Sequence, residues 1–207
     1  MDFPWVYGTF GMVAAYLCGS IPTSVWWGRA FHGVDVREHG SKNAGATNTF
    51  RVLGARAGIP VLLIDILKGF LPVYLGKQLG MGESVLSLLA LCAVLGHVFT
   101  PWLKFQGGKG VATALGVALA FRAAMILPAL GVFVVLLLVF RYVSLGSVMA
   151  ALTLLAVLIW KGATPVVLLL WADIVLIVVA KHHENIRRLL KGTESPLWGA
   201  KKEQAHG

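Results

Sequence analysis

Acidic residues are scarce in this chain. Its 207 residues include only 9 Asp and Glu against 18 Lys and Arg, and charged side chains make up 13% of the total. With 57% hydrophobic residues and a mean hydropathy of +0.79, the chain is far more apolar than an ordinary soluble domain. The sequence therefore predicts an integral membrane protein, without a linker that would separate two domains.

Cysteine is almost absent too, and several familiar site motifs are missing. Cys18 and Cys92 both lie in apolar stretches, which excludes a disulfide framework or a cysteine-rich metal site. The histidines show no metal-binding spacing, so no metal and no cofactor are expected. Neither a G-x-S-x-G elbow nor a His-x4-Asp pair is present. The segment Met1–Pro4 also lacks the basic start of a signal peptide, so the first apolar stretch is expected to remain as a span.

Long apolar stretches predict an all-α protein with seven transmembrane helices. A span needs about 20 apolar residues. The fourth stretch, Val111–Phe121, is short, because at about 1.5 Å per residue it covers only about 17 Å. The expected spans are Trp5–Trp27, Ala57–Gly76, Ser84–Leu103, Val111–Phe121, Ala123–Phe140, Tyr142–Trp160 and Gly162–Ala180.

The positive charges decide the orientation. With seven crossings, fourteen Lys and Arg side chains fall on one side of the membrane, only Lys77, Arg122 and Lys161 fall on the other, and Lys68 lies within a span. The positive-inside rule then places the N-terminus outside and the C-terminus in the cytoplasm. Because the cations gather at the ends of apolar stretches, the net charge of +9 indicates membrane orientation and not nucleic-acid binding.

Three polar segments fall on the cytoplasmic side of this topology. The first combines hydroxyls, amides and small residues that allow a ligand to approach the backbone closely. A solvated turn is the alternative interpretation, since the same residue types favour turns. The candidate binding residues here are Ser41, Asn43, Gly45, Thr47 and Asn48, with Arg51 after them.

The second segment precedes the short fourth span. Its glycines and Lys109 can present backbone N–H groups and one ammonium at a helix N-terminus, which suits an anion. It is not a Walker A loop, because Leu103 and Gly110 stand where that motif needs Gly and Ser or Thr. A flexible turn with a snorkelling lysine is the alternative. The candidates are Gly107, Gly108, Lys109, Gly110 and Thr113.

The third segment follows the last span. His182 and Asn185 are three residues apart and are expected on one face of a helix that continues out of the span, with Glu184 beside them. An interfacial histidine can bind phosphate or accept a proton near neutral pH, but it can also lie there without a role. Ser144 and Ser147 open the sixth span on the same side, while Asp65 and Lys68, at i and i+3, are expected to pair.

Four motifs carry a resemblance to a known family. Gly19–Pro22, Ser41–Asn48 with Arg51, Gly107–Thr113 and His182–Asn185 occur in an order that resembles the bacterial membrane-bound acyl-phosphate:glycerol-3-phosphate acyltransferases. The resemblance covers residues 8 to 190. One departure is Lys181, where arginine commonly precedes the histidine, and lysine cannot replace a planar guanidinium.

The resemblance implies a seven-helix enzyme of the bacterial inner membrane, with its active site on the cytoplasmic face. Such an enzyme transfers a fatty acyl group from acyl phosphate to the sn-1 hydroxyl of glycerol 3-phosphate. The products are lysophosphatidic acid and phosphate, the first step of phospholipid synthesis. Residues 1–192 would form this single domain and 193–207 a basic cytoplasmic tail. The implied partners are both substrates, the lipid bilayer and a soluble enzyme that makes acyl phosphate.

On this interpretation the catalytic residues are Ser41, Lys109, His182 and Asn185. His182 or a substrate phosphate oxygen would take the hydroxyl proton, and the sequence leaves both open. The other candidates would bind substrate: Arg51, Asn43, Gly45, Thr47, Asn48, Gly107, Gly108, Gly110, Thr113, Ser144, Ser147 and Glu184. A carrier for phosphate or glycerol phosphate is the alternative, because buried helix N-termini also serve transporters. A membrane scaffold is a third.

Overall fold

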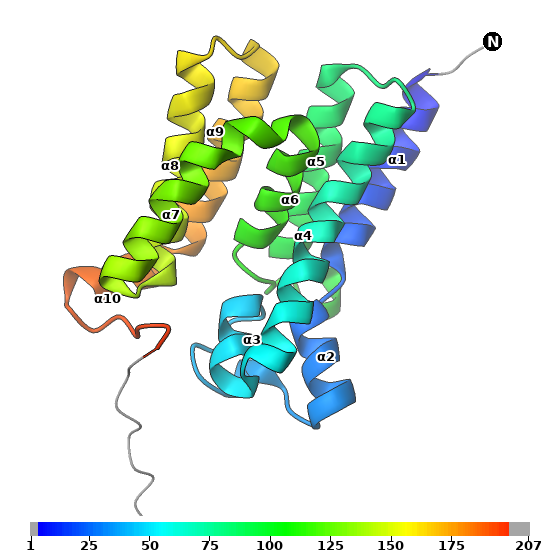
Figure 1. Cartoon of the computed structure of the whole chain (residues 1–207). Coiled ribbons are helices and arrows are strands. Elements are labelled where there is room, and N and C mark those ends of the chain that lie inside the picture. The colour runs from blue at the N-terminus through cyan, green and yellow to red at the C-terminus, as the bar shows by residue number, and fades with distance from the viewer. Residues whose placement is uncertain (1–3, 199–207) are drawn as a thin grey trace, which may run out of the picture.

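The computed structural model describes residues 4–198, which form helices joined by loops and contain no strand (Figure 1). The predicted all-α fold is therefore confirmed. In chain order the α-helices are α1 (Pro4–Ser20), α2 (Thr23–His32), α3 (Ala46–Leu53), α4 (Ala55–Gln78), α5 (Glu83–Val98), α6 (Val111–Arg122), α7 (Leu127–Phe140), α8 (Val143–Trp160), α9 (Pro165–Lys181) and α10 (His183–Leu190). Short 3-10 turns occur at η1 (Val36–Glu38), η2 (Pro101–Leu103) and η3 (Ala123–Ile126).

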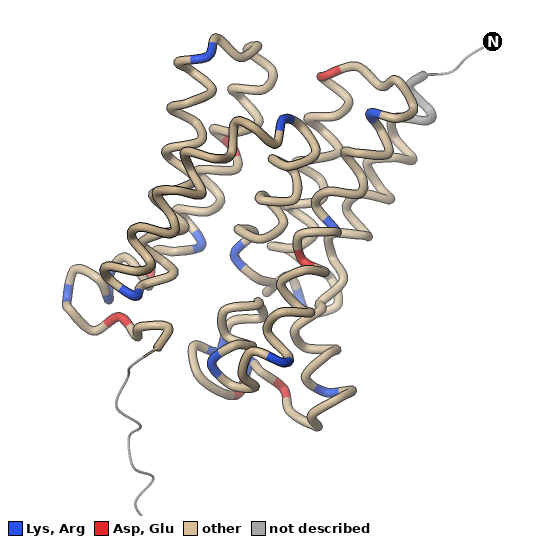
Figure 2. Tube along the Cα trace, viewed as in Figure 1, with Lys and Arg blue, Asp and Glu red and all other residues tan. Residues whose placement is uncertain are grey.

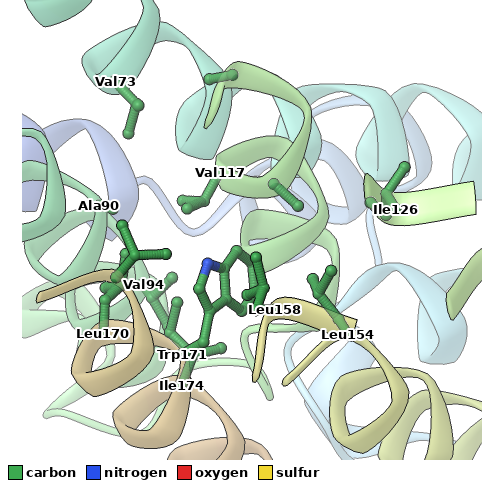
Figure 3. Packing of buried hydrophobic residues seen from close by; sticks show 14 of the residues in the cluster. Val73, Ala90, Val94, Val117, Ile126, Leu154, Leu158, Leu170, Trp171 and Ile174 are labelled. Atoms are coloured by element: carbon green, nitrogen blue, oxygen red, sulfur yellow. The ribbon is translucent and has the colours of Figure 1, made fainter. Parts of the chain in front are cut away.

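The helices form two groups that enclose one apolar core. Helices α1 to α6 lie on one side and α7 to α10 on the other, and α9 packs against both α5 and α8 (Figure 1). The core takes buried side chains from both groups, including Val94, Val117, Leu154, Trp171 and Ile174 (Figure 3). Helix α7 has little buried surface and exposes large apolar side chains such as Leu138. That is the expected surface for contact with lipid.

Glycines let the helices of the first group approach each other closely. A Cβ at Gly69 would lie 2.0 Å from the carbonyl oxygen of Thr113, and one at Gly116 would lie 1.9 Å from that of Ile66. Gly19 and Gly96 play the same part between α1 and α5. Since lipid supplies no hydrophobic force between helices, such close packing is what holds membrane helices together.

Length and composition support four candidate spans among the described residues, or five if a bent pair is one span. The continuous run Val111–Phe140 counts as one of them. This run nevertheless reverses direction at η3. The start of α6 and the end of α7 lie at the same end of the bundle, because residues next to both belong to one hydrogen-bond network. Lys109 donates to Asn185, whose amide donates to Glu194, which also accepts from Ser144.

The first predicted span, Trp5–Trp27, is not one continuous helix, so that prediction is wrong. Helix α1 ends at Ser20 and α2 begins at Thr23, because Pro22 cannot donate a helical hydrogen bond. The carbonyl of Ile21 accepts instead from Lys68 Nζ at 2.7 Å, so the break is stabilised by a buried side chain. Lys68 also forms the predicted ion pair with Asp65, at 2.8 Å.

The helix expected to continue out of the last span also breaks. His182 ends α9, and α10 leaves at an angle of 58°. Cations gather at the end of the bundle that holds α3 and α10, and fewer lie at the opposite end (Figure 2). This distribution gives the bundle one strongly basic end.

The close contact at Gly116 predicts a strong effect of one added methyl group. Gly116→Ala should lower the free energy of unfolding by about 2 kcal/mol, because the methyl overlaps the α4 backbone, which cannot yield like a side chain. Gly131→Ala is the matched control, since a Cβ at Gly131 of α7 meets nothing within 4 Å. Thermal unfolding in detergent measures both. Equal melting temperatures for the two variants would contradict the proposed contact.

Candidate active site

A cavity of about 490 Å³ lies between the two helix groups. At the basic end its wall is polar, and deeper in the bundle it is apolar. The polar lining residues are Ser41, Asn43, Thr47, Asn48, Arg51, Asp65, His97, Lys109, Ser144, Ser147, His182, Asn185 and Glu194. The apolar wall is formed mainly by residues of α6, α7, α8 and α9, such as Leu115, Leu130, Phe133, Leu154 and Trp171. The cavity therefore suits a ligand with one polar and one apolar end.

Asn48 holds the loop that carries Ser41. Its side-chain oxygen accepts from the backbone N–H of Ser41 at 2.8 Å, and its amide donates to the carbonyl of Val36 at 2.6 Å. Asn48 is almost fully buried, so its hydrogen-bonding groups are committed to the loop. It lines the cavity as a positioning residue for Ser41, whereas Asn43, Gly45 and Thr47 line the wall around the start of α3.

The glycines before α6 divide into two roles. The N–H groups of Gly107 and Gly108 donate to the carbonyls of Val98 and His97, and a Cβ on either residue would collide with His97. These two glycines pack the loop against α5 and do not line the cavity. Lys109 and Gly110 do line it, and Gly110 has φ +82°, a left-handed conformation that favours glycine.

Glu194 joins α8 and α10 of the second helix group. It accepts hydrogen bonds from Asn185 at 2.6 Å, Ser144 at 2.8 Å and Arg188 at 2.7 Å, and it is 6% exposed. Asn185 in turn accepts from Lys109. The result is a continuous polar network from the start of α6 to the start of α8.

The ring of His182 is fixed by its own helix. Its Nδ1 lies 2.7 Å from the carbonyl oxygen of Val178. Because a carbonyl oxygen can only accept, Nδ1 carries the proton and Nε2 remains an acceptor. Burial and the charge of Lys109 lower the pKa of His182 to about 4, so the ring is neutral at pH 7. His182 lines the cavity and can accept a proton there.

The basic end of the cavity combines cations with the acid Glu194. Burial, with the charges of Arg188 and Arg51, lowers the pKa of Lys109 to about 8, although Glu194 acts in the opposite direction. Burial alone would raise the pKa of Glu194, but the hydrogen bonds from Asn185, Arg188 and Ser144 lower it. Arg51 donates from Nη2 to the carbonyl of Ser195 at 2.9 Å, while its buried Nε has no partner among the described residues. That unpartnered donor suits an anionic ligand.

Most of the predicted site residues come together in this cavity, but four do not. The exceptions are Gly107, Gly108, Thr113 and Glu184. Thr113 is fully buried where α6 packs against α4, and Glu184 is exposed and pairs with Arg188 at 3.7 Å. The residues that line the cavity as a group are Ser41, Asn43, Gly45, Thr47, Asn48, Arg51, Lys109, Gly110, Ser144, Ser147, His182 and Asn185.

Sequence reasoning missed Glu194. The expected boundary at residue 192 placed it in a basic tail, yet Glu194 and Leu197 line the cavity, and the N–H of Leu197 donates to the carbonyl of Arg141. In the sequence, the available signal was that Glu194 is a single acidic residue between two groups of Lys and Arg. Residues 199–207 of the expected tail lie outside the described residues.

The chain is similar to known proteins over most of its length. A family model described as glycerol-3-phosphate acyltransferase matches residues 9–192. A glycerol-3-phosphate acyltransferase of Trichlorobacter lovleyi is 48% identical over 91% of this chain and 96% of its own. The protein of that name from Fusobacterium nucleatum is 44% identical over 89% and 95%.

Two solved structures have the same fold. Both are crystal structures of PlsY (YgiH), described as an integral membrane glycerol 3-phosphate acyltransferase. The glycerol 3-phosphate form superimposes with a TM-score of 0.87 at 39% identity and covers 93% of this chain and 96% of that one. The lysophosphatidic acid form gives 0.84 at 39% identity, over 92% and 95%.

The fold and the cavity define a multi-pass membrane protein whose cavity has a cationic end beside an apolar interior. The chain belongs to the glycerol-3-phosphate acyltransferase family.

The network around Glu194 predicts unequal roles for two glutamates. Glu194→Ala should lower the free energy of unfolding by about 2 kcal/mol, because Asn185 and Ser144 lose a buried charged partner. Glu184→Ala should change it little, since that side chain is 71% exposed. Thermal melting of the two variants in detergent measures the difference. A Glu194→Ala protein as stable as the native one would contradict a stabilising role for the network.

Proposed function

We propose that this protein transfers a fatty acyl group from acyl phosphate to the sn-1 hydroxyl of glycerol 3-phosphate, giving lysophosphatidic acid and phosphate. The observation that supports this most directly is that one cavity has both a cationic end and an apolar interior. Both substrates carry phosphate, and the donor also carries a long apolar chain. The related PlsY was solved in a glycerol 3-phosphate form and a lysophosphatidic acid form. The second of these ligands combines a phosphate with an apolar chain.

The phosphate groups would bind at the basic end of the cavity. Lys109 and Arg51 supply the positive charge, and Asn43, Thr47 and the start of α3 supply neutral donors. Ser41 and Asn185 would position glycerol 3-phosphate beside His182. Asn185 already accepts from Lys109, so the amide and the ammonium are held as a pair before substrate arrives.

The acyl chain would lie against the apolar wall made by α6, α7, α8 and α9. Leu115, Leu130, Phe133 and Leu154 belong to that wall. The chain then exchanges one apolar environment, the bilayer, for another. The carboxyl end is thereby placed at the boundary between the apolar wall and the cations.

The chemistry needs positioning more than a protein nucleophile, because acyl phosphate is already activated. The sn-1 oxygen forms an ester bond to the acyl carbon, the bond from that carbon to the phosphate oxygen breaks, and phosphate leaves with the electron pair. Lys109 and Arg51 stabilise the negative charge on the leaving phosphate. The hydroxyl proton goes to Nε2 of neutral His182 or to a substrate phosphate oxygen, whose second pKa is about 6.

The proposed topology has seven crossings in the bacterial inner membrane, with α6 as the short fourth, the N-terminus outside and the C-terminus in the cytoplasm. The basic end of the bundle supports this orientation (Figure 2). The active site would then face the cytoplasm, where a soluble enzyme that makes acyl phosphate could supply the donor.

An assay of donor and sidedness tests the proposal. Purified protein in detergent should form lysophosphatidic acid from glycerol 3-phosphate with acyl phosphate and not with acyl-CoA. In sealed vesicles, added glycerol 3-phosphate should be used when the cytoplasmic face is outward and not when it is inward. A phosphate carrier forms no new ester, so absence of product in detergent would remove the proposed function. Use of glycerol 3-phosphate from the other face would contradict the proposed topology but not the proposed function.

Lys109 predicts a fall of activity at alkaline pH. Its charge is present below a pKa of about 8 and is lost above it, so affinity for phosphate is present below this pH and weakens above it. The kcat/KM for glycerol 3-phosphate should fall about tenfold per pH unit above the pKa of the free enzyme. Lys109→Ala should lower kcat/KM at pH 7 and remove this dependence.

Lys191→Ala is the control for the pH experiment, because Lys191 is exposed and does not line the cavity. It should keep the native pH profile. An unchanged alkaline limb in Lys109→Ala would assign the titration to another group.

A further inference from the structure

A second, smaller cavity lies directly beyond the first. It has a volume of about 120 Å³ and shares three lining residues with the large cavity: Ala118 of α6, Leu154 of α8 and Trp171 of α9. Phe121, Met125, Leu158 and Val167 form apolar wall beside the partition, and the rest of the lining includes the polar residues Glu83, Arg122, Lys161 and Thr164. The two cavities are thus separated by a partition to which three helices each contribute one side chain.

We infer that Trp171 forms the end wall of the acyl-chain pocket and sets the longest chain the enzyme accepts. This inference rests on the proposed function, because it assigns the apolar part of the cavity to the acyl chain. It concerns a different property, since transfer of short chains does not depend on where the pocket ends.

The three partition residues lie at a similar depth below the basic end. Trp171 is eleven residues from His182, about 16 Å along a helix, and Leu154 is ten residues from Ser144, about 15 Å. Ala118 is eight residues from Gly110, about 12 Å. A chain whose head is held at Lys109 and His182 therefore reaches the partition after running most of the length of α6.

Trp171 is held firmly in the partition. It is 3% exposed and belongs to the main core cluster, where Leu154 and Leu158 of α8 lie on one side of its ring and Leu170 and Ile174 of its own helix on the other (Figure 3). Close-packed cores resist displacement of a large ring. By contrast, Ala118 leaves the third side of the partition small. The indole is therefore the main obstacle between the two cavities.

Steric rejection, and not hydrophobic gain, would give the length preference. Lipid tails are about as apolar as a leucine-lined pocket, so moving further methylenes from the bilayer into the cavity gains little. A chain that is too long must instead displace the indole or leave its own end outside. In apolar pockets one methylene changes kcat/KM by about 10- to 200-fold, and steric exclusion here should lie near the lower figure.

Variants on both sides of the partition test this. Trp171→Phe and Trp171→Ala progressively open the large cavity into the small one, and Ala118→Leu fills the deep end. Leu170→Ala is the matched control, because Leu170 is equally buried beside Trp171 but lines neither cavity. The measurement is kcat/KM for acyl phosphates of increasing chain length, from lauroyl to arachidoyl, at fixed glycerol 3-phosphate.

Trp171→Ala should raise the ratio of kcat/KM for the longest to the preferred chain about tenfold, with Trp171→Phe between it and the native enzyme. Ala118→Leu should move the preference to shorter chains, and Leu170→Ala should leave it unchanged. If Trp171→Ala does not fold, Trp171→Phe and Ala118→Leu still shift in opposite directions. Normal turnover with the native chain-length profile in those variants would contradict the role of Trp171 as the end wall. Absence of product with every acyl phosphate in the native protein would instead contradict the proposed function.

Discussion

The active site depends on one polar connection between two helix groups. Lys109, at the start of α6, donates to Asn185 of α10, and Asn185 and Ser144 both donate to Glu194. This connection, with the hydrogen bond from Arg51 to the carbonyl of Ser195, ties the second helix group to the first at the basic end of the cavity. A polar network in an apolar bundle is stable only when its members find partners, and these residues satisfy one another.

Irregular backbone at the site is supported by groups that would otherwise be unpaired. The break between α1 and α2 leaves a carbonyl that Lys68 satisfies, and the glycines before α6 donate to the end of α5. Both arrangements follow the general requirement that buried backbone groups find a partner. The site is therefore built where helices end, and each end is tied to a neighbouring helix.

Much of the fold could be predicted from the apolar runs, because each long run after Trp5–Trp27 became a helix near the expected bounds. The three polar segments could also be brought to one end by counting crossings and cations, and they do line one cavity. The helix breaks at Pro22 and His182 were harder to predict from the sequence. Pro22 is a local signal for a helix break, although its neighbours are apolar. No proline or glycine marks the 58° bend after α9 in the sequence.

The roles of individual polar residues were harder to predict than their grouping. Asn48 and Ser41 look alike as binding residues, but the amide of Asn48 is used by the loop itself. Glu194 could not be found from motifs that favour phosphate, since an acid there looks unfavourable to an anion. Its purpose becomes clear only from its hydrogen bonds.

The acid in the cavity has a further consequence for the catalytic cycle. Glu194 lies near Lys109 and Arg51, and its charge partly offsets theirs. A site with only cations would hold its anionic products tightly and slow their departure. In the proposed reaction, the partly compensated charge would bind phosphate less tightly than cations alone, so the residue that stiffens the site would also favour product release.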